Sequence, residues 1–484
     1  MNLINKYKTF PVQIRASFWF LISSFLQRGI SIITTPIFTR ILSTNEYGNY
    51  NVFNSWLGIV SIIVTLNLYC GVYMTGLVKF SDKKAVYTSA LQGLTLTLCT
   101  VWTLIYLVFQ NYWNNLFGLT TVQMLSMLIM VWTSTTYAFW ATNQRVEYKY
   151  QVMIIVTLLV SFAKPILGIV FVLCSDDKVT ARILALVVVE LVGYSWTFFY
   201  QMFKGKVFYD KEIWKYALSF NIPLIPHYLS AVILNNSDRI MIEKLVGASE
   251  AGIYSLAYSI SMLMILFNSA AQQTLLPWIY QKIKEKKQEE IHNVVYPLMA
   301  FIGVMNILII LFAPEVVRLF APSSYFEAIY VIPPIALSVF FMFIYDVFVP
   351  FEFYFEKTKY IATSSIISAI LNMILNFIFI PQFGYMAAGY TTLICYIMNA
   401  ILHFLFMRKV CIEEIGIQNV YKAQIVVIVS VLMCGVGFIF LALYDFTIAR
   451  YIIALLALFI LFFFRNRVFG LIKQFTKLKK VPTN

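Results

Sequence analysis

Long apolar runs separated by short polar intervals cover most of the chain. One helical crossing of a bilayer needs about twenty predominantly apolar residues. Counted on that basis, the pattern predicts fourteen membrane-spanning helices. Their expected ranges are 16–37, 51–76, 86–109, 117–140, 151–174, 181–203, 216–237, 254–277, 295–313, 327–349, 360–380, 386–407, 422–443 and 448–464. The longest polar interval, residues 280–293, is a connecting loop, so we expect no separate soluble domain.

A charged motif occurs twice between these apolar runs. The segment RILSTNEYGNY, residues 40–50, has the same spacing as KLVGASEAGIY, residues 244–254. In both copies a basic residue, an acid, a glycine and a tyrosine keep fixed positions, which packing alone does not require. We therefore predict a duplicated membrane hairpin. The matched charged residues are Arg40 with Lys244 and Glu46 with Glu250.

A second pair of segments extends the repeat. Residues 146–159 resemble residues 356–369, with a Lys-Tyr dipeptide at the same place in each. The two offsets, 204 and 210 residues, each span six predicted helices, and because six is even both copies have the same orientation in the membrane. We expect an all-α polytopic membrane protein with two six-helix lobes in parallel pseudo-repeat and two C-terminal helices. The expected divisions are an N-lobe at 1–210, a C-lobe at 211–410, and helices 13 and 14 with a basic cytoplasmic tail at 411–484.

The composition supports the membrane assignment. Hydrophobic residues make up 61% of the chain and charged residues 12%, and the mean hydropathy is +0.79. Soluble domains contain about 45–50% apolar and about 25% charged residues. The bilayer is therefore an expected partner of this chain.

The net charge of +14 would suggest a nucleic-acid partner in a soluble protein, but the basic residues lie mostly between the predicted helices. Of the 36 lysines and arginines, 27 fall on one side of the predicted topology and seven on the other, while Arg28 and Lys164 lie inside helices. Cytoplasmic loops of membrane proteins are rich in lysine and arginine. We therefore expect both termini in the cytoplasm and no nucleic-acid partner.

Cysteine and histidine usage argues against metal chemistry. The six cysteines show no CxxC spacing and the three histidines are dispersed, so we expect no metal site and no disulfide framework. The first apolar segment follows three basic residues and lacks a small-x-small cleavage site, so we interpret it as an uncleaved first helix. The tail, residues 468–480, is either an amphipathic helix on the anionic leaflet or a disordered basic segment.

Several of these segments resemble one known family. Residues 23–30 (SSFLQRGI) and 36–53 (PIFTRILSTNEYGNYNVF) are similar to the first hairpin of Wzx-type oligosaccharide flippases, members of the multidrug/oligosaccharidyl-lipid/polysaccharide (MOP) exporter superfamily. Residues 356–397 are similar to helices 11 and 12 of that family, whose hallmark is an Ile-Pro pair, a glycine and then small residues. One departure is Met386, where the family more often has a glycine beside the alanines, and it affects packing more than function.

The resemblance implies a MATE-like fold, in which two six-helix lobes form a V around a central cavity that opens to each side of the membrane in turn. It also implies a cargo of undecaprenyl-pyrophosphate-linked oligosaccharide, such as an O-antigen or capsule repeat unit, moved across the bacterial cytoplasmic (inner) membrane. Such a protein makes no covalent bond, so we expect no enzyme activity. A polysaccharide polymerase and a chain-length regulator are the expected protein partners.

Arg28 lies in the middle of the first predicted helix. A lone charge there costs about 2.5–3.5 kcal/mol on insertion scales, so Arg28 is expected to face a polar cavity or a partner. In the cavity its guanidinium would bind phosphate oxygens of the cargo in a bidentate manner. The alternative is an arginine whose charge is satisfied by helix carbonyls or by a neighbouring acid.

Lys164 and Glu190 are the next candidates, in predicted helices 5 and 6. Lys164 precedes Pro165, which is expected to bend the helix and free a carbonyl. Two interpretations fit Lys164: a second contact for the anionic cargo, or a side chain that extends to the interface. Glu190 is predicted to pair with Lys164 or with Arg28, and cargo would open that pair by displacing the acid.

A polar cluster ends predicted helix 7. Asn235, Asn236 and Arg239 are candidates for binding the cargo, and Asp238 is a candidate for binding a coupling ion. The alternative for the cluster is a solvated helix end at the outer face. Asp346 in predicted helix 10 is a further candidate for proton or sodium coupling, and no other cofactor is expected.

The charge count places the repeated motif at the outer face. We therefore predict that Arg40, Glu46, Lys244 and Glu250 lock or release an outer gate. Two proline pairs interrupt predicted helices, and each is interpreted either as a hinge or as a rigid kink. These pairs are Pro223 with Pro226 in helix 7 and Pro333 with Pro334 in helix 10.

Three other functions compete with the oligosaccharide flippase. An ion-coupled small-molecule (drug) exporter of the same superfamily would have twelve helices and would favour acids for organic cations, whereas Arg28 and Lys164 are basic. Helices 13 and 14 favour the lipid branch, because an extra apolar groove would hold a polyprenyl tail. A lipid II flippase is a near relative that the sequence separates poorly. A membrane polysaccharide polymerase is disfavoured because no predicted outward loop is long enough for a catalytic site.

Overall fold

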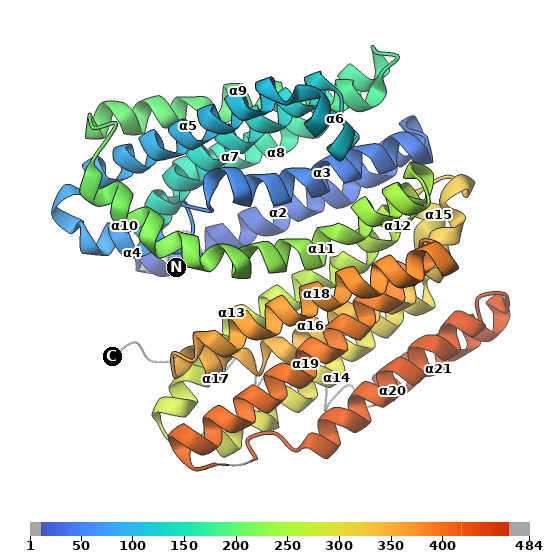
Figure 1. Cartoon of the computed structure of the whole chain (residues 1–484). Helices are drawn as coiled ribbons and strands as arrows, with labels where there is room; N and C mark the ends of the chain where they lie inside the picture. The colour runs from blue at the N-terminus through green and yellow to red at the C-terminus, as the bar shows by residue number, and fades with distance from the viewer. Residues whose placement is uncertain (1–10, 418, 464–484) are drawn as a thin grey trace, which may run out of the picture. The chain divides into compact units, whose positions relative to one another are not determined.

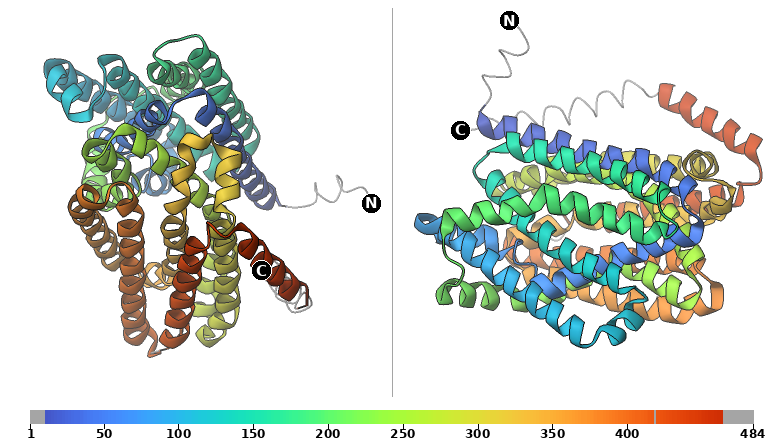
Figure 2. Two further views of the ribbon diagram at one scale, coloured as in Figure 1. Left: turned by 90° about the vertical axis from the view of Figure 1, so that its right-hand side faces the viewer. Right: turned by 90° about the horizontal axis from the view of Figure 1, so that it is seen from above.

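The computed structural model describes residues 11–417 and 419–463, and within these ranges all regular structure is helical (Figures 1 and 2). By their internal contacts the residues form two compact units: unit 1, Met1–Glu243, and unit 2, Lys244–Asn484. The predicted lobe boundary at residue 210 stays a prediction. The contacts assign the next two helices to unit 1. The predicted tail at 468–480 lies outside the described residues.

Unit 1 begins with the long helix α2 and ends in α11, whose last two residues belong to unit 2. Its elements are α2 (Val12–Ile41), α3 (Thr44–Thr65), α4 (Val72–Lys79), η1 (Ser81–Lys83), α5 (Lys84–Val108), α6 (Gln110–Phe117), α7 (Thr121–Val146), α8 (Tyr150–Leu173), α9 (Lys178–Gly205), α10 (Lys211–Asn221), η2 (Ile222–Leu224) and α11 (Ile225–Leu245).

Unit 2 continues the chain with eight further long or medium helices and several short ones. Its elements are α12 (Ala248–Ser261), η3 (Met262–Met264), α13 (Ile265–Lys284), η4 (Gln288–Glu290), α14 (Ile291–Leu311), α15 (Ala313–Phe320), η5 (Ser323–Tyr330), α16 (Ile332–Asp346), α17 (Val349–Tyr354), α18 (Thr358–Phe383), α19 (Met386–Ile415), α20 (Ala423–Ala442) and α21 (Thr447–Phe463).

Twelve helical segments in the described part of the chain are long and apolar enough to cross a membrane. The prediction of an all-α polytopic membrane protein is confirmed, while the predicted count of fourteen is approximate. Two predicted spans are not among the twelve. One corresponds to α3, whose first half is rich in asparagine, and the other to α21, whose described apolar stretch is short.

The predicted span 51–76 is wrong at both ends. Helix α3 starts at Thr44, because Ser43 and Glu46 form a capping box there. It ends at Thr65, because Leu66 and Asn67 have positive φ angles of 52° and 53°, which no continuing helix allows. Hydropathy alone did not register this break, since the residues on both sides of it are apolar.

The two proline pairs differ in their effect. Pro223 lies in the 3-10 turn η2 that separates α10 from α11, so predicted helix 7 is broken as expected. Pro333 and Pro334 do not interrupt a helix, because they occupy the first turn of α16. A proline is well tolerated there, since the first N–H groups of a helix have no intrahelical partner. Whether either pair acts as a hinge stays a prediction.

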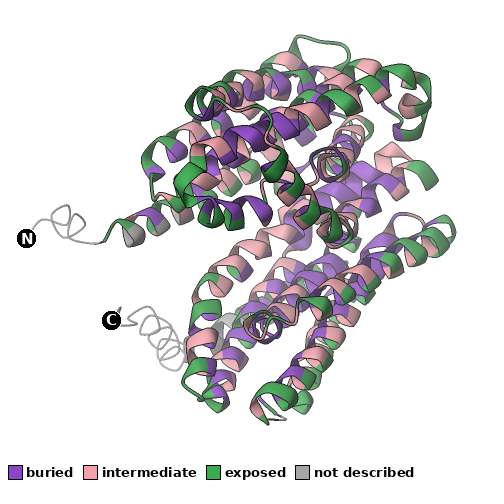
Figure 3. Ribbon diagram, turned by 60° about the vertical axis from the view of Figure 1, so that its left-hand side comes forward, coloured by how far each residue is buried: buried purple, intermediate pink, exposed green. Residues whose placement is uncertain are grey.

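Each unit has a buried central helix. In unit 1, α7 packs against α3, α5 and α9 around Phe53, Met127 and Ile183. In unit 2, α16 packs against α12, α14, α19 and α20, and Leu337 and Phe340 on it are fully buried. Buried residues gather on the helix faces that meet inside each unit (Figure 3). The remaining faces are apolar and exposed, as expected for helices in contact with lipid.

Polar side chains join α18 to α19 inside unit 2. Ser364 donates a hydrogen bond of 2.5 Å to Asn399 Oδ1, and Asn372 Nδ2 lies 3.3 Å from Thr392 Oγ1. Such interhelical hydrogen bonds each contribute about 0.6 kcal/mol on average in membrane proteins. They fix the rotation of α19, the helix that also carries one half of the buried pair described below.

Candidate functional site

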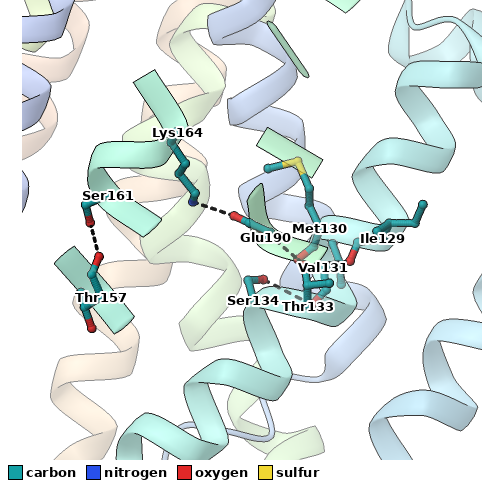
Figure 4. Close-up of polar contacts among 9 residues, drawn as sticks. All are labelled: Ile129, Met130, Val131, Thr133, Ser134, Thr157, Ser161, Lys164 and Glu190. Carbon is teal, nitrogen blue, oxygen red and sulfur yellow. Dashed lines mark hydrogen bonds and ion pairs between the residues drawn. The ribbon is translucent and has the colours of Figure 1, made fainter. Parts of the chain in front are cut away.

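The best-defined charged contact inside the membrane-spanning part of unit 1 joins α8 to α9. Lys164 Nζ lies 2.7 Å from Glu190 Oε1. Thr133 of α7 donates a hydrogen bond of 3.0 Å to Glu190 Oε2. Figure 4 shows the three side chains converging from three helices. Of the two partners predicted for Glu190, the structure therefore contains Lys164.

The two partners differ in exposure. The Glu190 side chain is 5% exposed, whereas that of Lys164 is 31% exposed. An ammonium group has three N–H donors. One of them bonds Glu190, and no second hydrogen bond reaches Lys164 from the described residues. Lys164 can therefore bind another anion from its exposed side, while Glu190 depends on Lys164 to offset the cost of burying its charge.

A glycine allows the two helices to meet at this point. A Cβ atom on Gly193, one turn after Glu190, would lie 2.5 Å from Val160 Cγ2 of α8. That distance is too short for any real side chain, so α9 approaches α8 closely only because position 193 is glycine. Small residues have the same role at many helix interfaces in membranes.

Aromatic rings line one side of the pair. The ring centroid of Tyr194 lies 5.8 Å from Lys164 Nζ, within the range of a cation–π contact. Tyr194 also stacks on Tyr137 of α7 at a centroid distance of 4.1 Å. The hydroxyl of Tyr137 in turn hydrogen bonds Thr157 on α8. The Lys164–Glu190 pair thus sits beside a wall of rings held by packing and hydrogen bonds.

Arg28 lies apart from this pair. It is exposed on α2, and it makes no hydrogen bond or ion pair with any residue that the structure describes. The alternative that a neighbouring acid satisfies Arg28 finds no support in the described ranges. Helix α2 does pack against α8, the helix that carries Lys164. Cargo contact by Arg28 stays a prediction.

The polar residues of α11 lie inside the helix, which continues to Leu245 rather than ending at the cluster. Asn235 Nδ2 and Asn236 Nδ2 each donate to a carbonyl of their own helix, at 2.7 and 2.9 Å. Asp238 is fully buried and Arg239 is 9% exposed. A solvated helix end therefore does not describe Asp238 and Arg239, and the predicted binding roles remain untested.

Asp346 is the last residue of α16 and is half-buried. It makes no hydrogen bond or ion pair within the described residues, so its carboxylate is available to a proton or a cation. Its predicted coupling role stays a prediction.

The two copies of the repeated motif differ in local structure. At the first copy, Ser43 N donates to Glu46 Oε2 at 2.7 Å, and Glu46 N donates to Ser43 Oγ at 3.2 Å, so Glu46 caps α3. At the second copy, α12 has Gly247 at its N-cap, and Gly247 has a φ of +156° and no capping side chain. Glu46 thus has a structural role, which the sequence pattern did not separate from the predicted gate.

Two basic residues of α9 contact α2 and α3 near the turn that joins these two helices. Arg182 of α9 is 9% exposed, and its guanidinium carbon lies 3.4 Å from the Tyr50 ring centroid and 3.7 Å from that of Phe38. Lys178 Nζ donates to the Ile41 carbonyl at 3.2 Å. These contacts join α9 to α2 and α3. The gate function of Arg40, Lys244 and Glu250 stays a prediction.

Two contacts between an acid and a base in unit 2 were not predicted. Glu352 of α17 and His403 of α19 lie with Oε1 and Nδ1 2.9 Å apart. Glu352 falls between the predicted spans 327–349 and 360–380, and His403 is one of the three dispersed histidines, so the sequence pattern did not indicate this contact. A histidine in the middle of an apolar helix was the signal that could have found this pair.

The second unpredicted pair joins α21 to α15. Arg450 is 2% exposed and binds both carboxylate oxygens of Glu315, at 3.0 and 2.9 Å. It also donates to the Leu311 carbonyl at 2.8 Å. Burial raises the pKa of Glu315, but hydrogen bonds from Arg450 and Tyr451 outweigh this effect and leave the pKa below its usual value. This bidentate contact attaches α21 to the rest of unit 2.

An apolar groove runs between α20 and the pair α16 and α19. Its volume is about 600 Å³. Its lining is almost entirely aliphatic and aromatic, with Phe341, Phe348, Phe404, Val427, Val431 and Phe438 among its residues. The groove therefore fits a hydrocarbon chain and no charged group. Its position beside α20 agrees with the groove that was expected next to predicted helix 13.

Solved structures share this fold. The lipid II flippase MurJ in an inward closed conformation superposes with a TM-score of 0.68 and 14% identity, over 92% of this chain and 99% of that one. An inward-facing multidrug resistance MATE family transporter of the MOP superfamily has a TM-score of 0.63 and 15% identity, over 79% and 94%. These similarities establish the fold that the resemblance implied.

The relatives found by sequence similarity match smaller parts of this chain. Lsg locus putative protein 1 of Haemophilus influenzae is 26% identical over 44% of this chain, and the match spans 56% of that relative. An uncharacterized membrane protein of the same organism is 24% identical over 74% of this chain and 88% of its own length. The probable low-salt glycan biosynthesis flippase Agl15 of Haloferax volcanii is 25% identical over 32% of this chain and 34% of that protein.

Two family profiles match the chain itself. The MatE profile matches residues 223–378. The profile described as polysaccharide biosynthesis protein matches residues 14–283, which is more than half of the 484 residues. The resemblance to the MOP superfamily is thereby confirmed, and this multi-pass membrane protein belongs to the polysaccharide biosynthesis protein family.

Proposed function

We propose that the protein is a flippase that moves undecaprenyl-pyrophosphate-linked oligosaccharide across a bacterial cytoplasmic membrane by alternating access. The observation that carries this proposal is the Lys164–Glu190 pair, an ion pair inside membrane-spanning helices whose cation is one-third exposed. Charged groups at that depth are rare and commonly mark the path of a polar cargo. The names of two relatives, a glycan biosynthesis flippase and a lipid II flippase, agree with such a cargo.

The pair is neutral when no cargo is bound, which keeps its cost in the membrane low. A pyrophosphate carries more than one negative charge and several acceptor oxygens, so it competes with the single Glu190 carboxylate for Lys164. The two N–H donors of Lys164 that the described residues leave unused are directed to such oxygens. When the cargo leaves, Glu190 recovers its partner. Binding is therefore strong enough to admit the cargo and still reversible.

Arg28 supplies a second cation in the same unit. It is exposed and has no acid partner in the described ranges, so its guanidinium is free to bind phosphate oxygens in a bidentate manner. Helix α2 packs on α8, which brings the helix of Arg28 against the helix of Lys164. Together the two residues provide positive charge for the diphosphate.

The apolar groove beside α20 accounts for the other half of the cargo. A polyprenyl chain is a pure hydrocarbon, and each CH₂ group moved out of water contributes about 0.8 kcal/mol. Because the groove lies between membrane-spanning helices, the chain exchanges lipid contacts for protein contacts there, so the groove provides selectivity for shape more than affinity. Its residues come from α16, α19 and α20, together with Phe348 between α16 and α17.

An assay of lipid translocation tests the proposal. Full-length protein in proteoliposomes is supplied with fluorescent undecaprenyl-pyrophosphate-linked oligosaccharide, and the label protected from an external quencher is measured over time. Lys164→Met is expected to lower the rate at least tenfold, while Lys409→Met, a change of an exposed lysine, is expected to leave it near the wild-type value. Equal rates for wild type and Lys164→Met would contradict the role of the pair.

The same assay separates the competing functions. A lipid II flippase would prefer the peptidoglycan precursor over undecaprenyl-pyrophosphate oligosaccharides. A small-molecule exporter would leave both lipids in place and move an organic cation. The MatE match at residues 223–378 favours this exporter as the second candidate. We also propose that the protein lies in the bacterial cytoplasmic membrane with both termini in the cytoplasm. A polysaccharide polymerase or a chain-length regulator is the proposed protein partner.

A further inference from the structure

Glu352 and His403 form an acid–base pair in unit 2 that binding of pyrophosphate does not use. The Glu352 side chain is 0% exposed and that of His403 is 2% exposed. Helix α17, which carries Glu352, packs against α13, α16, α18 and α19. No cargo can reach the pair without separating these helices. The species that can reach it is one as small as a proton.

One carboxylate oxygen of the pair lacks a partner. Glu352 Oε1 lies 2.9 Å from His403 Nδ1, but Glu352 Oε2 is buried and receives no hydrogen bond in the described part of the chain. Leaving a charged acceptor buried without a partner is costly, because the group loses its hydrogen bonds to water and gains none in return. A proton at this site relieves that cost, because it either pairs the carboxylate with an imidazolium or converts the carboxylate to an acid.

Charge balance favours the state in which one proton is added to the pair of a Glu352 carboxylate and a neutral His403 imidazole. With none, the pair has a net charge of −1, and with two it has a net charge of +1. With one proton the pair is neutral, whichever of the two atoms carries it. Burying an isolated charge among apolar helices is costly, so the buried arrangement favours the neutral state. The proton leaves only when water reaches the pair and offsets the charge that remains on Glu352.

The surroundings do not supply another counter-charge. Tyr345 of α16 stacks on the His403 ring at a centroid distance of 5.5 Å, and neither member of the pair makes a further hydrogen bond or ion pair with a described residue. Titratable and charged side chains on the helices packed around the pair are Tyr280, Lys282 and Lys284 on α13, Tyr345 and Asp346 on α16, Lys359 and Tyr360 on α18, and Tyr390, Cys395, Tyr396, Arg408, Lys409, Cys411, Glu413 and Glu414 on α19.

We infer that Glu352 and His403 form a proton-binding site that couples transport to the proton gradient, an inference that rests on the proposed flippase function. The proton is held on His403 Nδ1 in the hydrogen bond to Glu352 Oε1. On release the N–H bond breaks, its electron pair returns to the imidazole, and water accepts the proton. Conformations that admit water to α17 and α19 from one side load the site, and those that admit water from the other side empty it.

Histidine NMR tests proton binding directly, because the chain has only three histidines. Full-length protein with ¹⁵N-labelled histidine is reconstituted in lipid nanodiscs and titrated from pH 5 to pH 9. His227→Gln and His292→Gln assign the other two signals. In the wild type, His403 is expected to remain an imidazolium, with protons on both ring nitrogens, at least one pH unit above the usual titration of histidine, near 6.5, and Glu352→Gln is expected to abolish that retention. An unshifted His403 titration in the wild type overturns the inference.

Transport under a gradient tests coupling. Proteoliposomes that contain the fluorescent lipid-linked oligosaccharide are assayed with and without a proton gradient, and in a separate arm with a sodium gradient. The proton gradient is expected to accelerate net translocation severalfold in the wild type and in His292→Gln, but not in Glu352→Gln or His403→Gln. All four proteins are expected to retain equilibration of the lipid without a gradient.

The outcomes distinguish failure of the proton coupling from failure of the proposed flippase function. If Glu352→Gln still responds to the proton gradient, or if only sodium accelerates the wild type, coupling by this pair is overturned while the proposed function stands. If the wild type moves no lipid under any condition, the proposed function and the coupling fail together, and the NMR titration still decides whether the pair holds a proton. Because the NMR experiment uses the wild type, a variant that does not fold leaves the inference testable.

Discussion

Both units bury an acid beside a base between membrane-spanning helices, but the two pairs differ in which chemical species can reach them. In unit 1, Lys164 is 31% exposed and has unused donors, while Glu190 behind it is 5% exposed. In unit 2, Glu352 and His403 are almost completely buried. The first pair can be opened by an anion that competes for its cation. The second admits only a proton, unless its helices separate.

The difference teaches that the exposure of each partner decides what an acid–base pair inside a membrane can bind, as much as the distance between the two side chains does. The distances are similar, 2.7 Å and 2.9 Å. Lys164 has hydrogen-bond donors that an anion can reach from its exposed side. Histidine is the residue type that commonly gains and loses a proton near physiological pH, which is the property that the proposed coupling requires. Residue type and exposure together are the grounds on which we propose one pair for cargo binding and the other for proton coupling.

The largest expected effect comes from removing the cation of the exposed pair. Lys164→Met leaves the buried Glu190 carboxylate without its partner and is expected to cost about 3–5 kcal/mol of the free energy of unfolding. Glu190→Gln leaves a lysine that can extend toward water and is expected to cost about 1 kcal/mol. Equilibrium unfolding in mixed micelles measures both values.

A double variant sharpens this result. Lys164→Met combined with Glu190→Leu removes both charges and is expected to restore most of the stability, since replacing a buried ion pair with apolar residues is often neutral or stabilising. Translocation should remain lost in the double variant. Recovery of both stability and transport would mean that the pair has no role in cargo binding.

A smaller effect is expected in the fully buried pair. Glu352→Gln keeps the shape and can still accept a hydrogen bond from His403, so it is expected to cost about 1–2 kcal/mol in unfolding free energy. The cost should grow as the pH is lowered from 8, because the folded wild-type pair holds a proton more readily than the unfolded chain does and therefore gains stability as the pH falls, whereas Glu352→Gln lacks this gain. An unfolding series from pH 5 to pH 8 on both proteins provides the measurement. A cost that is the same throughout that range would contradict a titrating pair.

The pair that attaches α21 provides a third, structural case. Arg450→Lys keeps the charge but loses the bidentate contact with Glu315, and we expect a loss of about 1–2 kcal/mol without any change in gradient dependence. Thermal unfolding in nanodiscs and the translocation assay check the two statements. A change in gradient dependence would show that the contact is more than an anchor.

The smallest effect is a pH dependence at the same contact. The folded-state pKa of Glu315 lies below its unfolded value of about 4.5. A carboxyl group of this kind contributes stability above the unfolded pKa and loses that contribution as the pH falls through the folded pKa. The melting temperature should therefore decrease more below pH 4.5 in the wild type than in Glu315→Gln. Parallel curves for the two proteins would contradict the lowered pKa.

Most of the helical pattern could be predicted from the sequence. The positions of twelve apolar helices follow from local composition, because each crossing needs its own run of apolar residues. Failures came where backbone geometry overrode composition. The positive φ angles at Leu66 and Asn67 end α3 inside an apolar run, and the prolines at 333 and 334 start a helix instead of breaking one.

The candidate site was only partly predictable. Hydropathy identified Lys164 and Glu190 as charged residues inside predicted helices. Their pairing was one of two possibilities, since Glu190 was predicted to pair with Lys164 or with Arg28. Hydropathy missed Glu352, because that residue sits in a short helix between two apolar runs and its partner lies 51 positions away. The repeated motif suggested a gate at Glu46, which stays a prediction, and it did not reveal that Glu46 forms a capping box with Ser43 at the start of α3.

The sequence by itself determined that this chain is a helical membrane protein of a recognisable superfamily, because hydropathy and repeat spacing are properties of neighbouring residues. Only the tertiary structure decided which charges meet. Gly193 brings α9 against α8 so that Lys164 meets Glu190, and the packing of α17 against α19 seals Glu352 with His403. The physical reason is that the energy of a buried charge depends on its partner and its exposure, and both are set by how the helices pack.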